Sequence, residues 1–229
     1  MTSHEAAKLL AAHEETVTVV TGPPYRAATN AAPVLGSLFE QALVYVAAAH
    51  RNQRHKGGSV PYLSHLLGVA SLMLNHGGNE TEAVAALLHD CIEDCGTEHR
   101  PFIVEAFGTP VLTIMEACSD AAVKQGEEKP DWRGRKVGYL RHLRGQPPSV
   151  LLVSACDKLH NGRAILGDLR ISDQSVWQRF HQREADQLWY YRSLADAFLS
   201  LVPAVPVRLA DELNRTVLAI ERISAELRS

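Results

Sequence analysis

Residues 83–95 read Ala83-Val84-Ala85-Ala86-Leu87-Leu88-His89-Asp90-Cys91-Ile92-Glu93-Asp94-Cys95, so six apolar residues run directly into a cluster of ionisable groups. The apolar half predicts a buried helix, with Asn79 as its N-cap. If this helix continues at about 100° per residue, His89, Asp90, Glu93 and Asp94 share one face. Cys91, Ile92 and Cys95 then share the opposite face. The stretch therefore predicts an acidic cluster at the end of a buried helix.

The three carboxylates of this cluster repel one another at such close spacing. Burying them without a partner is costly, or forces some of them to take up protons. A divalent cation resolves the conflict, and imidazole plus carboxylate ligands suit Mn²⁺, Fe²⁺ or Zn²⁺. A solvated acidic helix end is the alternative, and this stretch alone leaves both interpretations open.

Two further segments carry a polar group where the pattern is otherwise apolar. Pro61-Tyr62-Leu63-Ser64-His65 places a histidine in the first turn of a predicted helix, where a lone histidine is more often structural or exposed. Asp157 lies in a helix that begins with the apolar run Val150-Leu151-Leu152-Val153, and Asn161 follows one turn later on the same face. A buried aspartate needs a partner, and a metal ion is a natural one.

The remaining pattern predicts an all-α bundle. Apolar periodicity and breakers predict further helices over residues 37–51, 62–75, 100–107, 109–119, 135–143, 148–166, 174–201 and 206–228. Ser37 is the expected N-cap of the first helix, and Gly77-Gly78 is expected to end the second. Residues 1–35 are expected to form a loosely attached arm, with one β-like run at 17–20, and residues 36–229 to form the main domain.

Composition limits the function classes. The chain has 229 residues and a formal net charge of −3, a size that suits one domain. The near-neutral charge argues against general nucleic-acid binding. No apolar stretch or N-terminal signal pattern predicts membrane insertion or export, and four scattered cysteines are typical of a reduced, cytoplasmic protein. The sequence makes no prediction of oligomeric state.

Residues 37–170 resemble the HD hydrolase domain of the RelA/SpoT homologues, especially the stand-alone small alarmone hydrolases. The resemblance rests on several strings that occur in the family's order and at similar spacings. They are Ala49-His50-Arg51-Asn52-Gln53-Arg54-His55-Lys56, Pro61-Tyr62-Leu63-Ser64-His65, Ala85-Ala86-Leu87-Leu88-His89-Asp90-Cys91-Ile92-Glu93-Asp94, Phe107-Gly108 and Asp157-Lys158-Leu159-His160-Asn161-Gly162-Arg163. The fold that the resemblance implies is an HD-domain helical bundle with additional C-terminal helices.

The resemblance also implies an activity, the removal of the 3′-pyrophosphate from guanosine tetra- or pentaphosphate. It implies that His65, His89, Asp90 and Asp157 bind the metal ion, usually Mn²⁺, although another divalent transition metal would fit the same ligands. It implies that Glu93 and Asp94 form the catalytic acidic pair, which orients and deprotonates the attacking water. It implies contacts from Lys56 and Asn161 to the nucleotide, and Arg54 and Lys158 are further candidates to offset the charge of the pyrophosphate.

The clearest departure from the family pattern is His55, which stands where the family usually has an arginine that resembles a stacking platform for the base. A histidine can stack, but it lacks the fixed cation and the fork of donors. The sequence therefore does not determine which base the site prefers, and the 2′-phosphate of NADPH and a tRNA-end pyrophosphate are alternative substrates. Leu66 replaces a usual proline, without expected consequence.

A non-catalytic module that senses an alarmone or pairs with a toxin is the alternative from another class. Since too few residues follow for a nucleotide-synthetase domain, hydrolysis without synthesis is expected.

Several other side chains have a structural interpretation. Core packing is favoured for Cys91 and Cys95, with redox sensitivity as the alternative, and a structural role behind the site is favoured for His50. The aromatic helix around Tyr190 and Tyr191 is expected to pack over the core, with base stacking as the alternative. The polar loop 121–134 either closes over an anionic substrate or forms a solvated connection. The loop contains the basic residues Lys124, Lys129 and Arg133, and Arg135 follows it directly.

Overall fold

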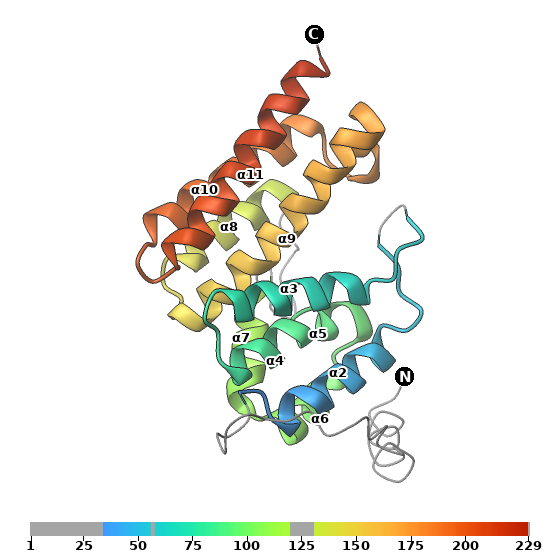
Figure 1. Ribbon diagram of the computed structural model, residues 1–229, viewed down its shortest axis with the longest axis vertical. Coiled ribbons are helices and arrows are strands. Elements are labelled where there is room, and N and C mark those ends of the chain that lie inside the picture. The colour runs from blue at the N-terminus through green and yellow to red at the C-terminus, as the bar shows by residue number, and fades with distance from the viewer. Residues whose placement is uncertain (1–33, 56–57, 120–130, 229) are drawn as a thin grey trace, which may run out of the picture.

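The computed structural model describes residues 34–55, 58–119 and 131–228, and this part of the chain is helical (Figure 1). The elements are α2 (Ser37–Ala49), α3 (Leu63–Asn75), α4 (Glu80–Leu88), α5 (Cys91–Cys95), α6 (His99–Phe107), α7 (Thr109–Cys118), α8 (Trp132–Leu143), α9 (Pro148–Ser172), the 3₁₀ helix η1 (Asp173–Arg179), α10 (Glu184–Ser200) and α11 (Val207–Glu226). Within the described ranges there is no strand beyond one β-bridge between Arg54 and Pro61. The predicted all-α class is therefore confirmed, while residues 1–33 with the run at 17–20 lie outside the described residues.

Helix α4 is the centre of the N-terminal half. Its residues Ala83–Leu88 are completely buried, and the helix packs against α2, α3, α7 and α9. A helix that is apolar all round is stable only inside such a layer of neighbours. The predicted cap is confirmed: the Asn79 side chain accepts from the Glu82 backbone N–H at 3.0 Å, and Glu82 accepts from Asn79 N–H at 2.8 Å.

The start of α2 differs from the prediction that Ser37 caps it. Gly36 is the N-cap, and it makes no side-chain cap. The carboxylate of Glu80, from the first turn of α4, accepts instead from the backbone N–H groups of Gly36 at 2.7 Å and Phe39 at 3.2 Å. A carboxylate from another helix thus satisfies the free donors and the positive end of the α2 dipole. The helix also ends at Ala49, two residues before the predicted Arg51.

The predicted end of α3 at Gly77-Gly78 is confirmed. Gly77 has φ +85°, a conformation that glycine adopts without strain. The Gly78 N–H donates to Met73 O at 3.0 Å and the Gly77 N–H to Leu74 O at 3.2 Å, the paired bonds of a Schellman motif. This turn leads the chain directly to the start of α4, and the C-terminal end of α4 carries the candidate functional site described below.

The C-terminal half is built around α9, which packs against α3, α4 and α7 as well as α10, η1 and α11 (Figure 1). This helix runs to Ser172, beyond the predicted residue 166. The prediction of one helix over 174–201 is wrong in its first part, because η1 occupies residues 173–179 and α10 begins only at Glu184. The 3₁₀ turn buries Val176 and Trp177, which explains the change of helix type.

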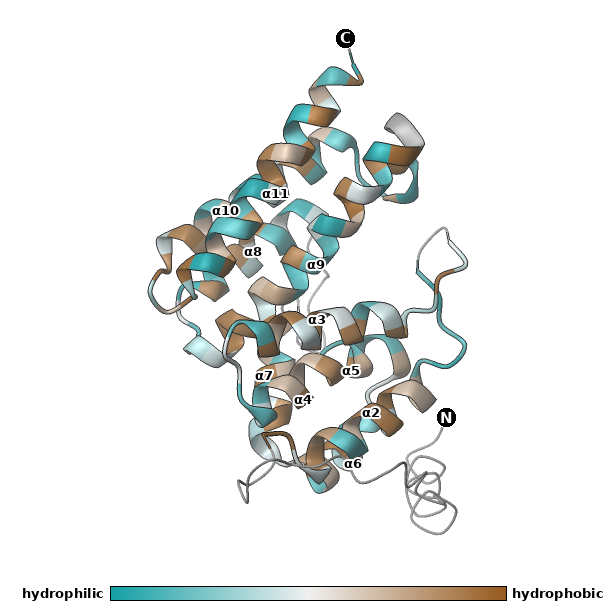
Figure 2. Cartoon of the chain, viewed as in Figure 1, coloured by the Kyte–Doolittle hydropathy of each residue, from teal (hydrophilic) through white to brown (hydrophobic). Residues whose placement is uncertain are grey.

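Helices α8, α10 and α11 complete this half. One face of α11 is buried at helical spacing, and Figure 2 shows brown, hydrophobic positions alternating with teal ones along it. The predicted packing of the aromatic helix is confirmed, since Tyr190 and Tyr191 of α10 are buried. Helix α8 begins at Trp132, earlier than predicted, because the Asp131 side chain caps it by accepting from Gly134 N–H at 2.7 Å. Lys124 and Lys129 lie outside the described residues.

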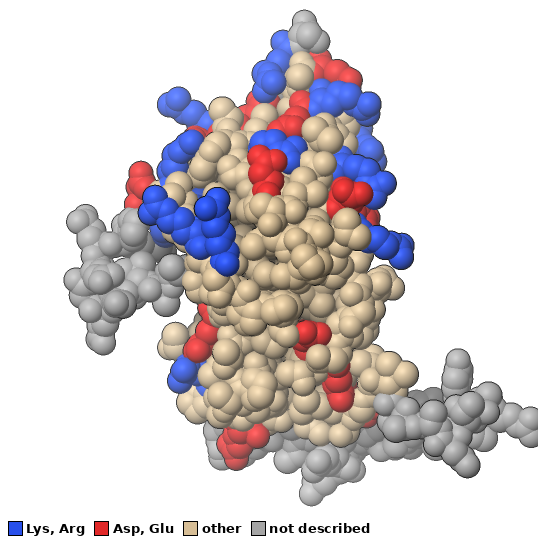
Figure 3. Space-filling model, turned by 90° about the vertical axis from the view of Figure 1, so that its left-hand side faces the viewer, with Lys and Arg blue, Asp and Glu red and all other residues tan. Residues whose placement is uncertain are grey.

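On the face shown in Figure 3, basic and acidic side chains are interspersed over the C-terminal helices, and few charges lie over the N-terminal half. Among the described helices, none is both long enough and apolar enough to cross a bilayer.

Candidate metal centre and active site

His89 and Asp90 lie at a break between two helices, not inside one helix as the angular argument assumed. Helix α4 ends at Leu88 and the short α5 begins at Cys91, although His89 (φ −55°, ψ −32°) and Asp90 (φ −95°, ψ −3°) keep right-handed helical angles. His89 Nδ1 lies 2.8 Å from the carbonyl oxygen of Ala86 in the last turn of α4. This bond fixes the proton on Nδ1 and leaves Nε2 as the donor atom for a ligand.

Four side chains from three segments meet at this point. His65 Nε2 lies 3.3 Å from Asp157 Oδ1 and 3.7 Å from Asp90 Oδ2. His89 Nε2 lies 3.1 Å from Asp90 Oδ2 and 3.7 Å from Asp157 Oδ1. His65 comes from the first turn of α3, the pair His89-Asp90 from the end of α4, and Asp157 from the middle of α9. The structure thus brings together the four residues predicted as metal ligands.

The donor set fits a divalent cation. Metal–ligand bonds of about 2.1 Å place neighbouring donors about 3.0–3.4 Å apart, depending on the angle between them, close to the four nitrogen–oxygen separations here. His89 Nε2 is buried and makes no hydrogen bond of acceptable geometry, despite its 3.1 Å approach to Asp90. A buried polar atom without a partner is costly, and a metal ion at this point would satisfy the ring nitrogen of a neutral His89. HD domains bind divalent metals, and this one has the ligands to do so.

The electrostatics of the site favour a positive charge between the two carboxylates. Burial opposes charge on His89, but Asp90 and Asp157 raise the pKa of its imidazole well above the ordinary value. Burial also opposes ionisation of Asp157, but Lys158 and then the two histidines lower its pKa well below the usual range. Burial opposes ionisation of Asp90 as well, but His89 lowers the pKa of Asp90 to about 2. Both carboxylates are therefore ionised, as metal ligands must be.

Two neighbours hold the metal-ligand candidates in place. The Tyr62 hydroxyl donates to Asp90 Oδ2. His160 Nδ1 lies 2.9 Å from His65 Nδ1, and burial followed by the charge of His65 lowers the pKa of His160 to about 4, so that it accepts as a neutral ring. Such contacts set the tautomer and orientation of a ligating histidine. Gly68 makes room for this ring, since a Cβ there would lie 2.1 Å from His160 Nε2.

Asp157 is held by two residues that the sequence assigned to the substrate. Lys158 Nζ lies 2.6 Å from Asp157 Oδ2, and the Asn161 amide donates to Oδ1. The Lys158 ammonium also lies 5.2 Å from the centre of the Tyr139 ring, and its side chain is 16% exposed. Both residues thus contact the metal-ligand candidate in this structure, and their contact with a nucleotide stays a prediction.

The predicted catalytic pair lies on α5, immediately after the ligand candidates. Glu93 and Asp94 are both exposed, as groups that meet a substrate from solvent must be. The Gln53 amide donates to Asp94 Oδ2 at 2.7 Å. Asp94 is therefore oriented by a residue 41 positions earlier in the chain.

The predicted substrate residues before α3 are only partly placed. His55 lies beside the ligand candidates: its ring centroid is 5.4 Å from that of Tyr62 and 6.2 Å from that of His65. Arg54 is exposed in the β-bridge to Pro61. Lys56 lies outside the described residues. In α8, Arg133 stacks over Trp189 at 3.7 Å and pairs with Asp186 at 3.3 Å, so its role here is helix packing.

Sequence reasoning expected a structural role for His160 but did not identify its partner, and it missed the supporting residues Tyr62, Gly68 and Gln53. Tyr62, Gln53 and His160 stand inside the strings that carry the family resemblance, which was the available signal. Nothing local identifies their partners, because the bonds join residues 28, 95 and 41 positions apart.

Comparisons with known proteins agree with this geometry. Guanosine-3′,5′-bis(diphosphate) 3′-pyrophosphohydrolase MESH1 of Xenopus tropicalis is 32% identical over 151 residues, which cover 65% of this chain and 78% of the relative. MESH1 of Danio rerio is 35% identical over 123 residues, covering 52% of this chain and 64% of the relative. The chain spans only 17% of the length of the GTP pyrophosphokinase rsh of Brucella melitensis, at 33% identity over 56% of this chain.

The solved structure of a metazoan orthologue of SpoT that hydrolyses ppGpp shares the fold. It has a TM-score of 0.62 at 23% identity, over 83% of this chain and 97% of that one. Residues 42–190 match the HD domain family, a span that holds every residue of the metal centre described above. The resemblance seen in the sequence is confirmed, and the chain belongs to the HD domain family.

Proposed function

We propose that the protein is a metal-dependent phosphohydrolase that converts ppGpp and water to GDP and pyrophosphate. The observation that carries the proposal is the meeting of two histidines and two ionised aspartates around the unpartnered Nε2 of His89. An exposed acidic pair follows directly on α5. The MESH1 relatives support the choice of substrate, since they are named for this reaction.

His65, His89, Asp90 and Asp157 would hold the ion, and Mn²⁺ is the proposed one because mixed imidazole and carboxylate ligands suit it. When bound, the ion supplies Lewis-acid activation of water and of a phosphoryl oxygen. Four protein ligands leave further coordination positions of Mn²⁺ to water and substrate. Four free cysteines fit a reducing compartment, and we place the activity in the cytoplasm.

Residues of this chain would activate the water, bind the leaving group and bind the base. Glu93 accepts the proton of the attacking water as general base, and Asp94, held by Gln53, orients that water. Arg54 and Lys56 offset the charge of the leaving pyrophosphate. His55 would stack on the base, a role supported by its position beside Tyr62 at the edge of the metal centre.

The test is incubation of the purified protein with ppGpp and Mn²⁺, with products resolved by anion-exchange chromatography. GDP and pyrophosphate are expected from the wild type and not from Asp157→Asn. Equal product from both proteins would contradict the assignment of the metal centre.

A parallel incubation with NADPH tests the alternative substrate. Phosphate release from NADPH without turnover of ppGpp would replace the guanosine substrate and make His55 the residue that changed specificity. Bound Mn²⁺ with no turnover of any nucleotide would favour the non-catalytic module.

A further inference from the structure

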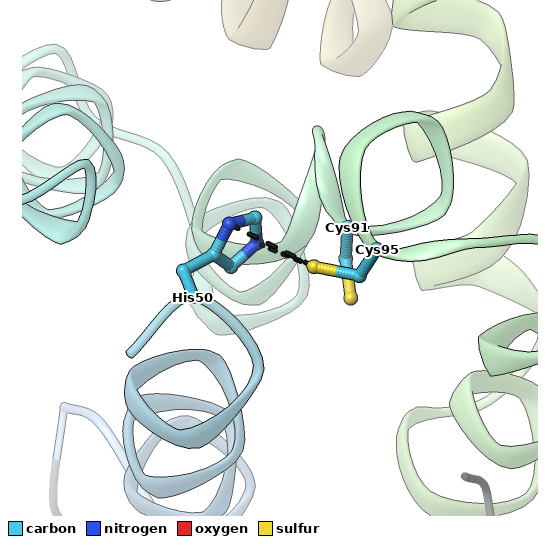
Figure 4. Close-up of side chains that lie close together, drawn as sticks. All are labelled: His50, Cys91 and Cys95. Atoms are coloured by element: carbon cyan, nitrogen blue, oxygen red, sulfur yellow. Dashed lines mark hydrogen bonds between the residues drawn. The ribbon is translucent and has the colours of Figure 1, made fainter. Parts of the chain in front are cut away.

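A second cluster of metal-binding side chains lies on the other side of α5. His50, just after α2, meets Cys91 and Cys95 of α5, and one ligand atom from each lies within 4.8 Å of the others. Figure 4 shows the Cys95 sulfur directed at the imidazole of His50, with Cys91 beside it. His50 and Cys91 are buried and Cys95 is half-buried. Core packing, the favoured interpretation of the cysteines, does not require a histidine at this point.

The geometry of the cluster suits a zinc-like ion. Cys95 Sγ lies 3.6 Å from His50 Nε2 and 3.8 Å from Nδ1. A tetrahedral ion with bonds of about 2.3 Å to sulfur and about 2.0–2.1 Å to nitrogen places those two atoms about 3.6 Å apart. The observed separation therefore needs little change to admit the ion.

The partners of His50 and Cys95 also suit ligation. Gln53 Oε1 lies 2.5 Å from His50 Nδ1, so the Nδ1 proton is donated to the amide oxygen and Nε2 faces the Cys95 sulfur at 3.6 Å. Ligating histidines are usually held in this way. The thiol of Cys91 and then His50 lower the pKa of Cys95 to about 5 against its burial, and the same contact between the two sulfurs raises the pKa of Cys91.

We propose that His50, Cys91 and Cys95 form a second metal site, distinct from the histidine–aspartate centre, for a divalent ion of the zinc class. In the bound site, one neutral imidazole and two thiolates balance the charge of a divalent ion, which keeps the buried site neutral. The Cys91 proton passes to solvent when the ion binds. Thiolate ligands select zinc-class ions over Mn²⁺, so the two centres would discriminate between metals.

A bound ion at this site would act on the catalytic pair. Gln53 bridges the two centres, because its Oε1 contacts His50 and its Nε2 donates to Asp94. Glu93 and Asp94 also lie between the two cysteines on the five residues of α5. Occupancy would therefore fix the position of the acidic pair, a consequence that rests on the proposed function, whereas the metal site itself does not.

The test uses Co²⁺ as a spectroscopic substitute for zinc, added to the reduced full chain in excess Mn²⁺. Only thiolate-bound Co²⁺ gives a sulfur-to-metal charge-transfer band, and the first centre has no sulfur ligand. The expected result is a band that saturates at one thiolate-bound Co²⁺ per chain and disappears when Zn²⁺ is added. Cys95→Ser should lose the band, and Cys156→Ser, which changes a buried cysteine outside the cluster, should keep it.

A wild type without this band, or a band unchanged in Cys95→Ser, would overturn the proposal. His50→Gln provides a second variant that leaves both sulfurs in place, and it should weaken Co²⁺ binding at least tenfold. Circular dichroism checks that each variant is folded. If neither variant folds, the presence or absence of the band in the wild-type titration decides the proposal. A charge-transfer band without turnover of ppGpp would refute the proposed function and leave this site standing. Turnover that Zn²⁺ changes in the wild type, but not in Cys95→Ser, would establish the link to Asp94.

Discussion

Asp157 has two roles in the structure that a pair of substitutions can separate. Its Oδ1 faces His65 Nε2 at 3.3 Å in the metal centre, and its Oδ2 lies 2.6 Å from Lys158 Nζ. The two side chains of the ion pair are only 10% and 16% exposed. Asp157→Asn keeps the shape of the side chain but removes the charge that serves both the ion and the lysine.

The expected size of the effect follows from this burial. Removing one partner of a buried ion pair costs about 3–5 kcal/mol, because the other charge is left without compensation. In a domain of this size each kcal/mol lowers the melting temperature by about 2–4 °C, so Asp157→Asn should melt about 6–20 °C lower in metal-free buffer. The double variant Asp157→Asn, Lys158→Met removes both charges and should recover most of that loss. Neither variant should bind Mn²⁺ or turn over ppGpp.

The assay combines thermal unfolding in chelator with calorimetric titration of Mn²⁺ and turnover of ppGpp. Two outcomes would refute the reasoning. Wild-type Mn²⁺ affinity in Asp157→Asn would show that this carboxylate is not a ligand. A double variant no more stable than Asp157→Asn would show that the unpaired Lys158 charge is not the source of the instability.

Three further predictions concern single side chains. Glu93→Gln should slow turnover by about 10²–10⁴-fold with Mn²⁺ still bound. Steady-state kinetics with metal analysis checks this, and normal turnover would show that Glu93 is not the general base. His160→Phe should weaken Mn²⁺ binding by about 10–100-fold because His65 loses its Nδ1 partner, which calorimetry measures against the wild type. The rate of Cys95 alkylation should rise as pH increases through about 5, where the thiol ionises, and not near the usual thiol value. Peptide mapping across pH reads this out, with buried Cys118 expected to stay unmodified because its pKa is raised to about 11.

Elements that depend on local sequence could be predicted. The buried α4 follows from its unbroken apolar run, and the Asn79 cap and the Gly77-Gly78 stop are short-range signals. The prediction of a Ser37 cap was wrong because the Glu80 carboxylate, 44 residues beyond Gly36, satisfies the free N–H groups at this helix end. Residues 174–183 failed for a related reason, since burial of Trp177 against the bundle overrides helical periodicity there.

The candidate site shows the same division. The ligand candidates could be identified because each is an ionisable residue in an apolar helix or next to one, and because their strings resemble a family. Their supports could not, since the contact between His65 and His160 exists only once α3 packs on α9. The substrate contacts assigned to Lys158 and Asn161 show the limit of sequence reasoning. The sequence shows that both residues are near Asp157, but not that both already bind its carboxylate.

Two kinds of chemistry occur within seven residues because the helical backbone angles continue past the end of α4 at Leu88. The projection of residues 89–95 on one helix correctly separated the acidic face from the cysteine face, because His89 and Asp90 keep helical angles across the break. It could not show that His50 lies opposite the cysteines, because that approach depends on the end of α2 at Ala49. A five-residue helix is too short to be stable by itself. The contacts on both of its faces therefore determine where Glu93 and Asp94 lie, and a metal ion bound by the two sulfurs would act on this proposed catalytic pair.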